Sequence, residues 1–502
     1  MTSTTRSILP VFALLCLAGC KVGPDFILPH SNVPPLFIHT GDEGFGGPSV
    51  LNAAKPLDAD WWKLFGDPAL DALIQRAAAG NLDVKLASAR LREARAQRGV
   101  IAAEDYPQVN LNAKADRSRQ SPNSFQTFSG GGGGEARNLF QVGFDANWEL
   151  DFFGRISRNV EAASADIQSA EEDRRDVLVT LVSEVARNYV ELRGFQQRLD
   201  IARRNIQLQQ ETLDIAASRL KAGLTNDLDV AQAESSLSGA RSTVPPLDRS
   251  VQAAIHRLCV LLGQQPTALS VELAQSAAIP AVPPEVPVGL PSELLRRRPD
   301  IRRAERGLAA STARIGVATA ELYPRFSLTG SFGFAADKVP TLPDASSRFW
   351  SFGPAVKWPV LDWGRIRANI NVQDARAEQA LIQYERAVLT SFEDVENALT
   401  SYTREQSRRR ILAEALASNQ RAFDLASEQY RSGITDFQRV LDSQRTLFAS
   451  QDSLSDSDRT VSSNLVAVYK ALGGGWEPFA PIAETSPAPR PSPLWENRLG
   501  SN

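Results

Sequence analysis

The longest pattern of hydrophobic and polar positions in this chain is helical and covers residues 365–432, a stretch without glycine or proline. Apolar and small residues recur there at alternating spacings of four and three, which is typical of a helix packed against a neighbouring helix. An unbroken helix of this length would be about 100 Å long. Gly433 ends the pattern, Thr435 or Asp436 can cap a new helix, and a second such run continues to Leu472. The sequence therefore predicts a long antiparallel helical hairpin.

The same pattern occurs earlier in the chain. Five residues return 210 positions later: Trp148, Gly154, Gly223, Thr225 and Gly263 correspond to Trp358, Gly364, Gly433, Thr435 and Gly473. Upstream, Tyr106 and Pro107 return as Tyr323 and Pro324, displaced by 217. Two duplicated units therefore account for most of the chain. The units differ at Val244-Pro245-Pro246, which predicts a kink or break in the first return helix only.

Between the helices of each unit the hydrophobic period changes to two. Residues 107–151 and 324–361 each contain two alternating segments, which predict a β-hairpin. The segments have the length of tilted membrane strands, about 9 to 11 residues. Aromatic residues at the ends nearest the helices fit a belt at the membrane interface, although each could also be an ordinary core residue. These are Tyr106, Trp148, Tyr323, Trp358 and Trp363.

Four such strands cannot remain open in lipid. Two free edges would expose roughly twenty backbone groups, each at a cost of several kcal/mol, whereas a whole domain is stable by only about 5 to 15 kcal/mol. Several copies of the chain must therefore share one closed sheet, and a symmetric ring is the simplest closure. This argument does not set the number of copies.

The N-terminus reads as a targeting segment. Arg6 precedes an apolar run at residues 8–18 that is too short to span a bilayer, and Leu17-Ala18-Gly19-Cys20 follows. The stretch resembles a bacterial lipoprotein signal, which implies cleavage before Cys20 and acylation of Cys20. An ordinary secretory signal with an incidental cysteine is the alternative. By the same resemblance, Lys21 after the cysteine favours sorting to the outer membrane.

Composition argues against several other classes of function. The chain has 502 residues, is 43% hydrophobic and carries a net charge of -3, so it has no basic excess to attract nucleic acid. His30, His39 and His256 are scattered, and Cys259 is the one thiol left after removal of the signal and acylation. We find no nucleophile elbow, phosphate loop or metal constellation. We therefore expect neither an enzyme nor a cofactor other than the covalent lipid on Cys20.

These patterns predict an α+β membrane protein with six successive segments. They are a signal peptide at 1–19, a lipidated, extended, proline- and glycine-rich segment at 20–68, a first repeat at 69–267, a linker at 268–290, a second repeat at 291–473, and a proline-rich tail at 474–502. Each repeat contains a helix, a β-hairpin (107–151 or 324–361) and a helical hairpin (155–262 or 365–472).

Several short motifs carry a resemblance to a known family. They are Val22-Gly23-Pro24-Asp25-Phe26, Trp61-Trp62, Asp67-Pro68, Arg298-Pro299-Asp300-Ile301-Arg302 and Leu472-Gly473-Gly474-Gly475-Trp476. With the two glycine-tipped hairpins, they resemble the lipid-anchored outer-membrane channels of tripartite efflux pumps, the NodT-like relatives of TolC.

That resemblance implies a homotrimer with a twelve-stranded barrel in the outer membrane and a tunnel of twelve helices in the periplasm. It implies a periplasmic adaptor and an inner-membrane transporter as partners, commonly a transporter of the resistance-nodulation-division type. The chain would then be a passive duct for drugs or other small toxic compounds. An outlet for type I polypeptide secretion and a structural coiled-coil lipoprotein without a lumen are the alternatives.

The resemblance also assigns candidate sites. The hairpin tips would dock the adaptor through Gly223, Leu224, Thr225, Gly433, Ile434 and Thr435; a bare helix cap without a binding role is the alternative reading of the two glycines. Asp442 matches a carboxylate of the periplasmic gate, with Arg439, Tyr430 and Arg431 nearby. Arg439 departs from the acid of some relatives, and a solvated pair of Arg439 with Asp442 is the alternative reading.

Overall fold

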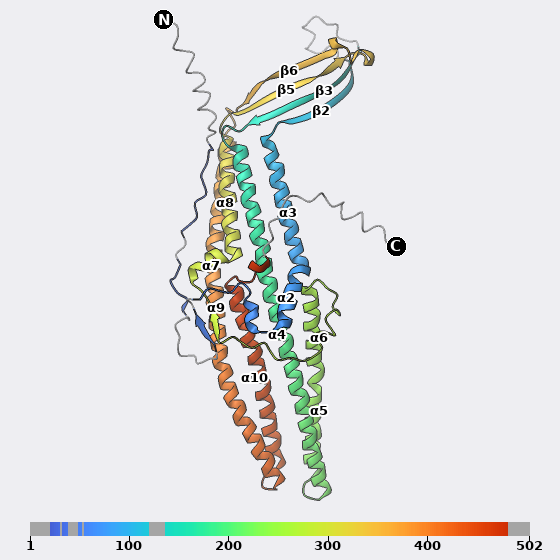
Figure 1. The fold of residues 1–502 in the computed structure, drawn as a ribbon, viewed down its shortest axis with the longest axis vertical. Helices are drawn as coiled ribbons and strands as arrows, with labels where there is room; N and C mark the ends of the chain where they lie inside the picture. Colours follow the sequence, from blue (N-terminus) through green and yellow to red (C-terminus); the bar gives the residue numbers. More distant parts are fainter. Residues whose placement is uncertain (1–20, 31–32, 39–48, 53–54, 120–135, 480–502) are drawn as a thin grey trace. The chain divides into compact units, whose positions relative to one another are not determined.

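Two compact units, each built from three stretches of the chain, make up the computed structural model (Figure 1). The structure describes residues 21–30, 33–38, 49–52, 55–119 and 136–479. Unit 1 comprises Met1–Asn32, Ser88–Asp173 and Asp300–Val388, and unit 2 comprises Val33–Ala87, Arg174–Pro299 and Leu389–Asn502. Helices α4 (Arg155–Lys221) and α9 (Arg365–Arg431) contribute to both units. The long helix expected at 365–432 is thereby confirmed.

Unit 1 contains a sheet of four antiparallel strands in the order β2-β3-β5-β6. The strands are β2 (Gln108–Arg119), β3 (Ala136–Leu150), β5 (Arg325–Ala336) and β6 (Arg348–Lys357). Strand β3 pairs with β5, so the two predicted hairpins join into one sheet. Their backbones approach closely at Gly143 and Gly333, where a Cβ added to Gly333 would lie 2.6 Å from the Cα of Gly143. Within the described residues of one chain the sheet is open, with β2 and β6 at its edges.

The last strand is shorter than the alternating pattern predicted. The pattern continues to Val360, but β6 ends at Lys357. Pro359 cannot donate a backbone hydrogen bond to a neighbouring strand, and the Trp358 indole instead donates to the carbonyl of Leu322 at 3.0 Å. In the first hairpin the Trp148 indole donates to the carbonyl of Asp105, also at 3.0 Å. Each tryptophan thus ties a strand to the end of the helical segment that precedes its hairpin.

The helices of unit 1 are joined by ion pairs. Helix α8 (Pro299–Ala320) contacts α4 through Arg303 and Asp173 at 2.7 Å and through Arg314 and Asp166 at 2.5 Å. Residue numbers rise along one helix as they fall along the other, so the two helices are antiparallel. Helix α3 (Leu82–Ala102) adds a hydrogen bond from Arg98 to Ser164 of α4 at 2.9 Å.

The core of unit 2 is built around a tryptophan pair. Trp61 and Trp62 lie in a short 3₁₀ helix, η3 (Trp61–Phe65), and both are fully buried. Trp61 stacks on Tyr469 of α10 (Phe437–Ala471) with ring centroids 4.8 Å apart, and its indole donates to the carbonyl of Gly474 at 3.3 Å. The Trp62 indole donates to Asp71 of α2 (Pro68–Gly80) at 2.8 Å. The tryptophan motif therefore joins the N-terminal segment to the end of the last long helix.

Asp67 explains the neighbouring aspartate-proline motif. Its carboxylate caps α2 by accepting from the backbone of Ala69 at 2.9 Å, and Pro68 occupies the first helical position, which needs no N–H donor. The same carboxylate accepts from the Tyr189 hydroxyl of α4 at 2.7 Å. Burial and this hydrogen bond raise the pKa of Tyr189 to about 12, so the hydroxyl remains a donor at any physiological pH.

Arg298 accounts for the glycines that follow Leu472. It follows α7 (Pro291–Arg297), and its buried guanidinium donates to the carbonyl of Ala471 at 2.9 Å and to Asp394 of α9 at 3.0 Å. A Cβ on Gly473, whose φ is +73°, would lie 2.7 Å from the Arg298 side chain. The arginine thus supplies a hydrogen-bond donor to a backbone carbonyl at the end of α10. Its side chain leaves no room for a Cβ at position 473, so glycine is required there.

The predicted break in the first return helix is confirmed, and a further interruption separates α2 from α3. Helix α2 ends at Gly80, and the Asn81 side chain caps α3 by accepting from Asp83 at 2.8 Å. The first return helix breaks into α5 (Asp227–Ser242) and α6 (Val244–Leu261) at the Val244-Pro245-Pro246 sequence, whereas α10 is continuous.

Two further strands, β1 (Val50–Asn52) and β4 (Glu285–Pro287), pair in parallel in unit 2. A search of the helices in the described residues finds none that is both long and apolar enough to cross a membrane.

Replacing Arg298 with alanine should lower the free energy of unfolding by about 3 kcal/mol, because it leaves buried carbonyls and Asp394 without their partner. The exposed Arg296 is the matched control, and its replacement by alanine should change stability by no more than about 0.5 kcal/mol. Denaturant unfolding of the purified protein measures both. Equal stability of the two variants would show that Arg298 does not hold this junction.

Candidate functional site

The two hairpin tips in unit 2 have the same backbone structure. Gly223 follows α4 with φ +69°, and Gly433 follows α9 with φ +76°. At the first tip the amide of Leu224 donates to the carbonyl of Arg219 at 2.9 Å, and at the second the amide of Ile434 donates to that of Gln429 at 2.8 Å. These bonds and the positive φ define a Schellman cap, which favours glycine.

Each tip then begins a new helix with a capping side chain. The Asn226 side chain accepts from the amide of Asp229 at 3.1 Å, and the Asp436 carboxylate accepts from the amide of Arg439 at 3.1 Å. Asp436 is thus the capping residue at the second tip. Asp227 and Asp229 lie in the first turn of α5, where carboxylates interact favourably with the helix dipole.

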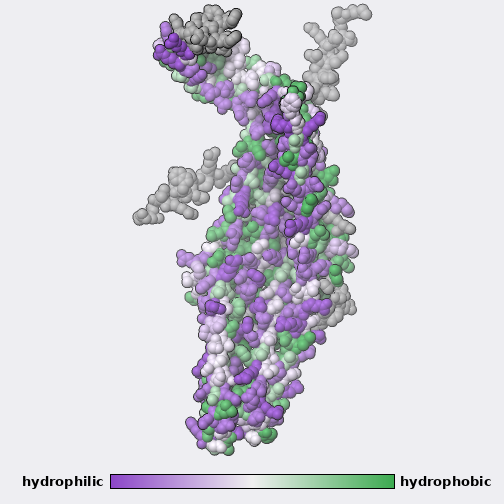
Figure 2. Space-filling model, turned by 180° about the vertical axis from the view of Figure 1, so that it is seen from behind, coloured by the Kyte–Doolittle hydropathy of each residue, from purple (hydrophilic) through white to green (hydrophobic). Residues whose placement is uncertain are grey.

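Both tips present an apolar side chain to solvent. Leu224 is 66% exposed and Ile434 is 76% exposed, and a Cβ added to either tip glycine would meet nothing within 4 Å. Hydrophobic residues lie among polar ones at this end of the surface (Figure 2). Exposed apolar residues at equivalent places, on a rigid cap, are suited to contact another protein.

A contact between the hairpins lies next to the tips. Arg219 of α4 donates to the carbonyl of Tyr430 of α9 at 2.9 Å, and its guanidinium lies 4.6 Å from the centre of the tyrosine ring. The ring also contacts Phe437 of α10, with centroids 5.3 Å apart. Burial raises the pKa of Tyr430 against the opposing charge of Arg219, so the hydroxyl stays protonated at neutral pH. Sequence reasoning missed Arg219, because nothing in the local pattern relates it to a residue on another hairpin.

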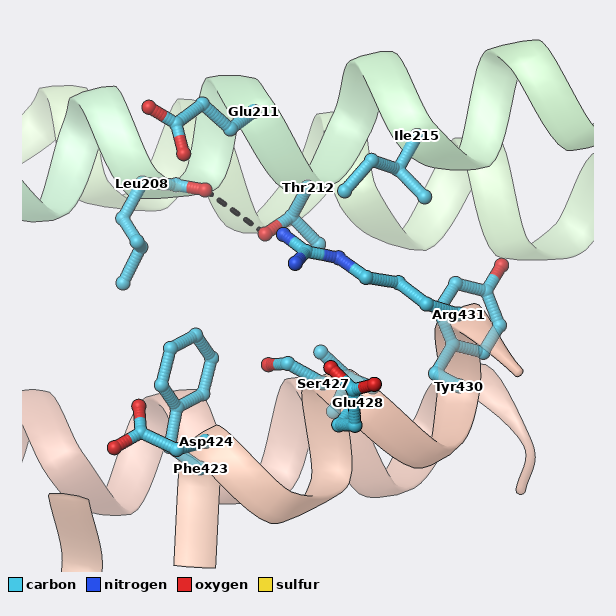
Figure 3. Close-up of a pocket in the computed structure, with 11 residues that line it drawn as sticks. Leu208, Glu211, Thr212, Ile215, Phe423, Asp424, Ser427, Glu428, Tyr430 and Arg431 are labelled. Carbon is cyan, nitrogen blue, oxygen red and sulfur yellow. Dashed lines mark hydrogen bonds between the residues drawn. The ribbon is translucent and has the colours of Figure 1, made fainter. Parts of the chain in front are cut away.

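The predicted gate residues fall into two groups. Tyr430 and Arg431 lie where α9 faces α4, and Arg431 extends toward Thr212 of α4 (Figure 3). Arg439 and Asp442 lie on the exposed side of α10.

In the described chain the side-chain partner of Asp442 is not the Arg439 of the alternative reading. Asp442 accepts a hydrogen bond from Gln438, one turn earlier on α10, at 2.9 Å, and no ion pair to Arg439 occurs among the described residues. Spacings of three and four both bring side chains together on a helix, so sequence alone could not choose between the two partners.

A cavity of about 300 Å³ lies between α4 and α9 (Figure 3). Leu208, Ile215 and Phe423 give it apolar walls. Glu211 and Glu428 line it from opposite helices, and Arg431 lines it beside them. The two hairpins are therefore incompletely packed just beyond the Arg219 and Tyr430 contact.

Most of the chain matches one family of known proteins. The model of the family described as "Outer membrane efflux protein" matches residues 73–264 and 290–474. The chain belongs to this outer membrane efflux protein family. Nodulation protein T of Rhizobium leguminosarum bv. trifolii is 31% identical over 477 residues, which cover 95% of this chain and 98% of that protein. The pyoverdine export outer membrane protein OpmQ of Pseudomonas aeruginosa is 34% identical over 443 residues, which cover 87% of this chain and 93% of that protein.

The fold agrees with this membership. The solved structure of the outer-membrane channel OprN matches with a TM-score of 0.84 and 37% identity, over 91% of this chain and 100% of that one. The predicted resemblance is confirmed. As a member of this family, the chain is an efflux channel of the outer membrane that extends into the periplasm, and the alternative of a tether without a lumen is set aside.

In this efflux protein the aromatics predicted for the membrane interface lie at the ends of strands and helices in unit 1. Tyr106, Trp358 and Trp363 are exposed, Trp363 at 91% and with a φ of +54°. Tyr323 stacks on Phe153 with ring centroids 4.6 Å apart, and Trp148 is partly exposed. The structure thus places these aromatic residues outside a closed core, which leaves the belt as a prediction.

Other predicted features are outside the described residues or are not seen in them. Cys20, the expected acylation site, lies outside the described residues, as do residues 480–502 of the tail. Among the described residues no three His, Cys, Asp or Glu side chains are grouped so that they could hold a metal ion. Cys259 is buried.

Replacing Arg219 with alanine removes a hydrogen bond and a cation–π contact that join the hairpins. We expect amide hydrogen exchange in the tip segments 219–231 and 428–439 to become about tenfold faster, since the two interactions together contribute roughly 1 to 2 kcal/mol. Exposed Lys221, two residues away, is the control, and its replacement should leave exchange unchanged. If the amides exchange equally slowly in both variants, Arg219 does not stabilise the contact between the hairpins, and the apolar side chains alone hold it.

Proposed function

We propose that three copies of this chain form one duct, with a closed twelve-stranded barrel above a tunnel of twelve helices. The observation that carries the proposal is the open sheet of four antiparallel strands in each chain. Its strands have 12, 15, 12 and 10 residues, which is enough to cross a bilayer when tilted. Edges β2 and β6 would pair between neighbouring copies, because unpaired backbone groups in lipid are too costly. Because the unit is duplicated, each copy contributes two β-hairpins to the barrel and two helical hairpins to the tunnel.

The duct is passive and works with two partners. It receives its cargo from an inner-membrane transporter, of the resistance-nodulation-division type, through a periplasmic adaptor. Its cargo is drugs or other small toxic compounds. The relative OpmQ, which is named for pyoverdine export, supports a small-molecule cargo over a secreted polypeptide.

The adaptor binds at the hairpin tips through Gly223, Leu224 and Thr225 and through Gly433, Ile434 and Thr435. The exposed Leu224 and Ile434 supply apolar contact area, and the Schellman caps hold them in a fixed conformation, which lowers the entropy lost on binding. The open space around each glycine leaves the backbone accessible to a partner helix.

The periplasmic gate lies just beyond these tips. In the closed state, Arg219 and Tyr430 hold the two hairpins of each chain together, with Arg431 beside them. Asp442, with Arg439 one turn earlier, contributes a ring of three carboxylates in the trimer. Such a ring attracts cations.

The N-terminus is anchored by acylation of Cys20. Each buried CH₂ contributes about 0.8 kcal/mol to membrane binding, so several acyl chains hold the chain firmly. Within unit 1, the described segment that begins at Lys21 contacts α4 and α8.

Replacing Gly433 with valine should abolish efflux while the trimer still reaches the outer membrane, because the side chain strains the cap and covers the docking surface. Gly239 of α5 also has open space around its Cβ position but lacks the positive φ, so Gly239→Val is a matched control that should retain efflux. Drug susceptibility of the strains, with the trimer quantified in membranes, measures both.

The variant Ile434→Asp separates docking from strain, since it leaves the glycine cap intact. It should also lose efflux. Normal drug resistance in both Gly433→Val and Ile434→Asp at normal trimer levels would reject the tips as the adaptor site.

Replacing Asp442 with alanine should lower the cation-to-anion permeability ratio of the closed channel about threefold, because three carboxylates leave the constriction together. Asp214 of α4 accepts from Gln210 at 3.1 Å in the same way that Asp442 accepts from Gln438, so Asp214→Ala is a matched control. Planar-bilayer recordings give the ratio. An unaltered ratio in Asp442→Ala would remove this carboxylate from the gate.

A further inference from the structure

An arginine buried in unit 1 binds the first described residues of the chain. The Arg158 side chain on α4 is only 2% exposed. Its guanidinium donates to the carbonyl of Val22 at 3.1 Å, to the carbonyl of Gly23 at 3.3 Å and to the carboxylate of Asp25 at 2.7 Å. The guanidinium also donates to the carboxylate of Glu161, on the same helix, at 3.0 Å. A buried guanidinium needs such acceptors, and most of them here come from a segment outside any helix or strand.

Glycines on three parts of the chain make room for this segment. Gly23 has a φ of +89°, and a Cβ there would lie 2.4 Å from the Cα of Gly316 on α8. A Cβ on Gly154 would lie 2.9 Å from the Cα of Lys21, and one on Gly316 would lie 2.9 Å from the Arg158 side chain. The fit therefore depends on close backbone approach at Lys21 and at Gly23.

Residues 21–26 thus occupy a specific binding site, which we call the anchor slot and define by Gly154, Arg158 and Gly316. The amide of Val22 also donates to the carbonyl of Phe153 at 3.3 Å, and the Phe26 ring lies 6.0 Å from the guanidinium of Arg306.

The anchor slot lies beside the ends of the strands. Phe153 follows β3 and stacks on Tyr323, which precedes β5. Phe152 contacts Phe326 of β5, with ring centroids 5.2 Å apart. The slot therefore holds Lys21 next to the junctions where helices give way to strands, at the level of the predicted interface aromatics.

We propose that the anchor slot fixes the height at which the acylated N-terminus enters the membrane relative to the sheet. This rests on the acylation of Cys20 in the proposed function. With Lys21 held, one residue separates the slot from the lipid, a reach of about 3.8 Å.

Without the slot, the first buried side chain among the described residues is Phe37. A flexible leader of about sixteen residues spreads over roughly 20 Å. That spread exceeds half of the ~30 Å hydrocarbon thickness. The slot, and not the lipid, therefore sets the register between anchor and sheet.

The test uses the full-length, acylated protein in vesicles of phosphatidylethanolamine and phosphatidylglycerol. A nitroxide on Lys21→Cys reports mobility and depth, and Cys259 is buried away from the labelling reagent. Gly23→Val changes only the segment and leaves α4 and α8 intact, and Arg158→Gln changes only the slot. Ile27→Ser is the matched control, because Ile27 is 83% exposed just after the segment.

We expect an immobile label with a narrow depth distribution in the parent and in Ile27→Ser. In Gly23→Val and Arg158→Gln the label should become mobile and its depth distribution at least threefold wider. A label that stays immobile at the same depth in both variants would overturn the proposal. The mass of the N-terminal peptide reports acylation separately, and an unmodified Cys20 would overturn the anchoring role. Efflux is measured independently, so a failure of the proposed duct is distinguishable from a failure of the slot.

Discussion

Two helices of 67 residues each need partners along their length, because a helix in a protein takes most of its stability from packing against other elements. In unit 2, α4 and α9 do so in three successive ways. An apolar cluster surrounds Trp61 and Tyr469, and a smaller one surrounds Tyr430 and Phe437 near the tips. Between them the contacts are polar: Arg198 of α4 pairs with Asp452 of α10 at 2.7 Å, and Arg409 of α9 pairs with Asp458. The hydrogen bond to Asp452 raises the pKa of Arg198, so this layer stays charged.

The short motifs that carry the family resemblance serve close packing. Glycines 473 and 475 leave room for Arg298 and Trp61, and Gly23 leaves room for Gly316. In each case a side chain or a backbone segment lies so close to the glycine that a Cβ there would clash with it. The motif residues are far apart in sequence because they fasten separate segments to the two long helices.

The hairpin tips show how one local structure can serve two different settings. Both end in the same glycine cap and expose one apolar residue. Beyond the caps the hairpins differ: the first return helix breaks at Pro245, whereas the second is continuous and packs Phe437 against Tyr430. The two equivalent tips therefore stand on unequal helical supports, one broken and one continuous.

The sequence by itself determined the long helices, the glycine caps, the break at Val244-Pro245-Pro246, the four strands and the family, because each of these depends on local periodicity or on residues with special backbone geometry. It misjudged the end of β6, where Pro359 and the indole of Trp358 compete with strand pairing. Only the tertiary structure decided that Arg219 holds Tyr430, that Gln438 and not Arg439 binds Asp442, and that Arg158 holds the N-terminal segment. Most of these contacts join residues far apart in the chain, and even the Gln438 contact is a choice between two neighbours. Such pairings follow from the packing of helices, which no local pattern encodes.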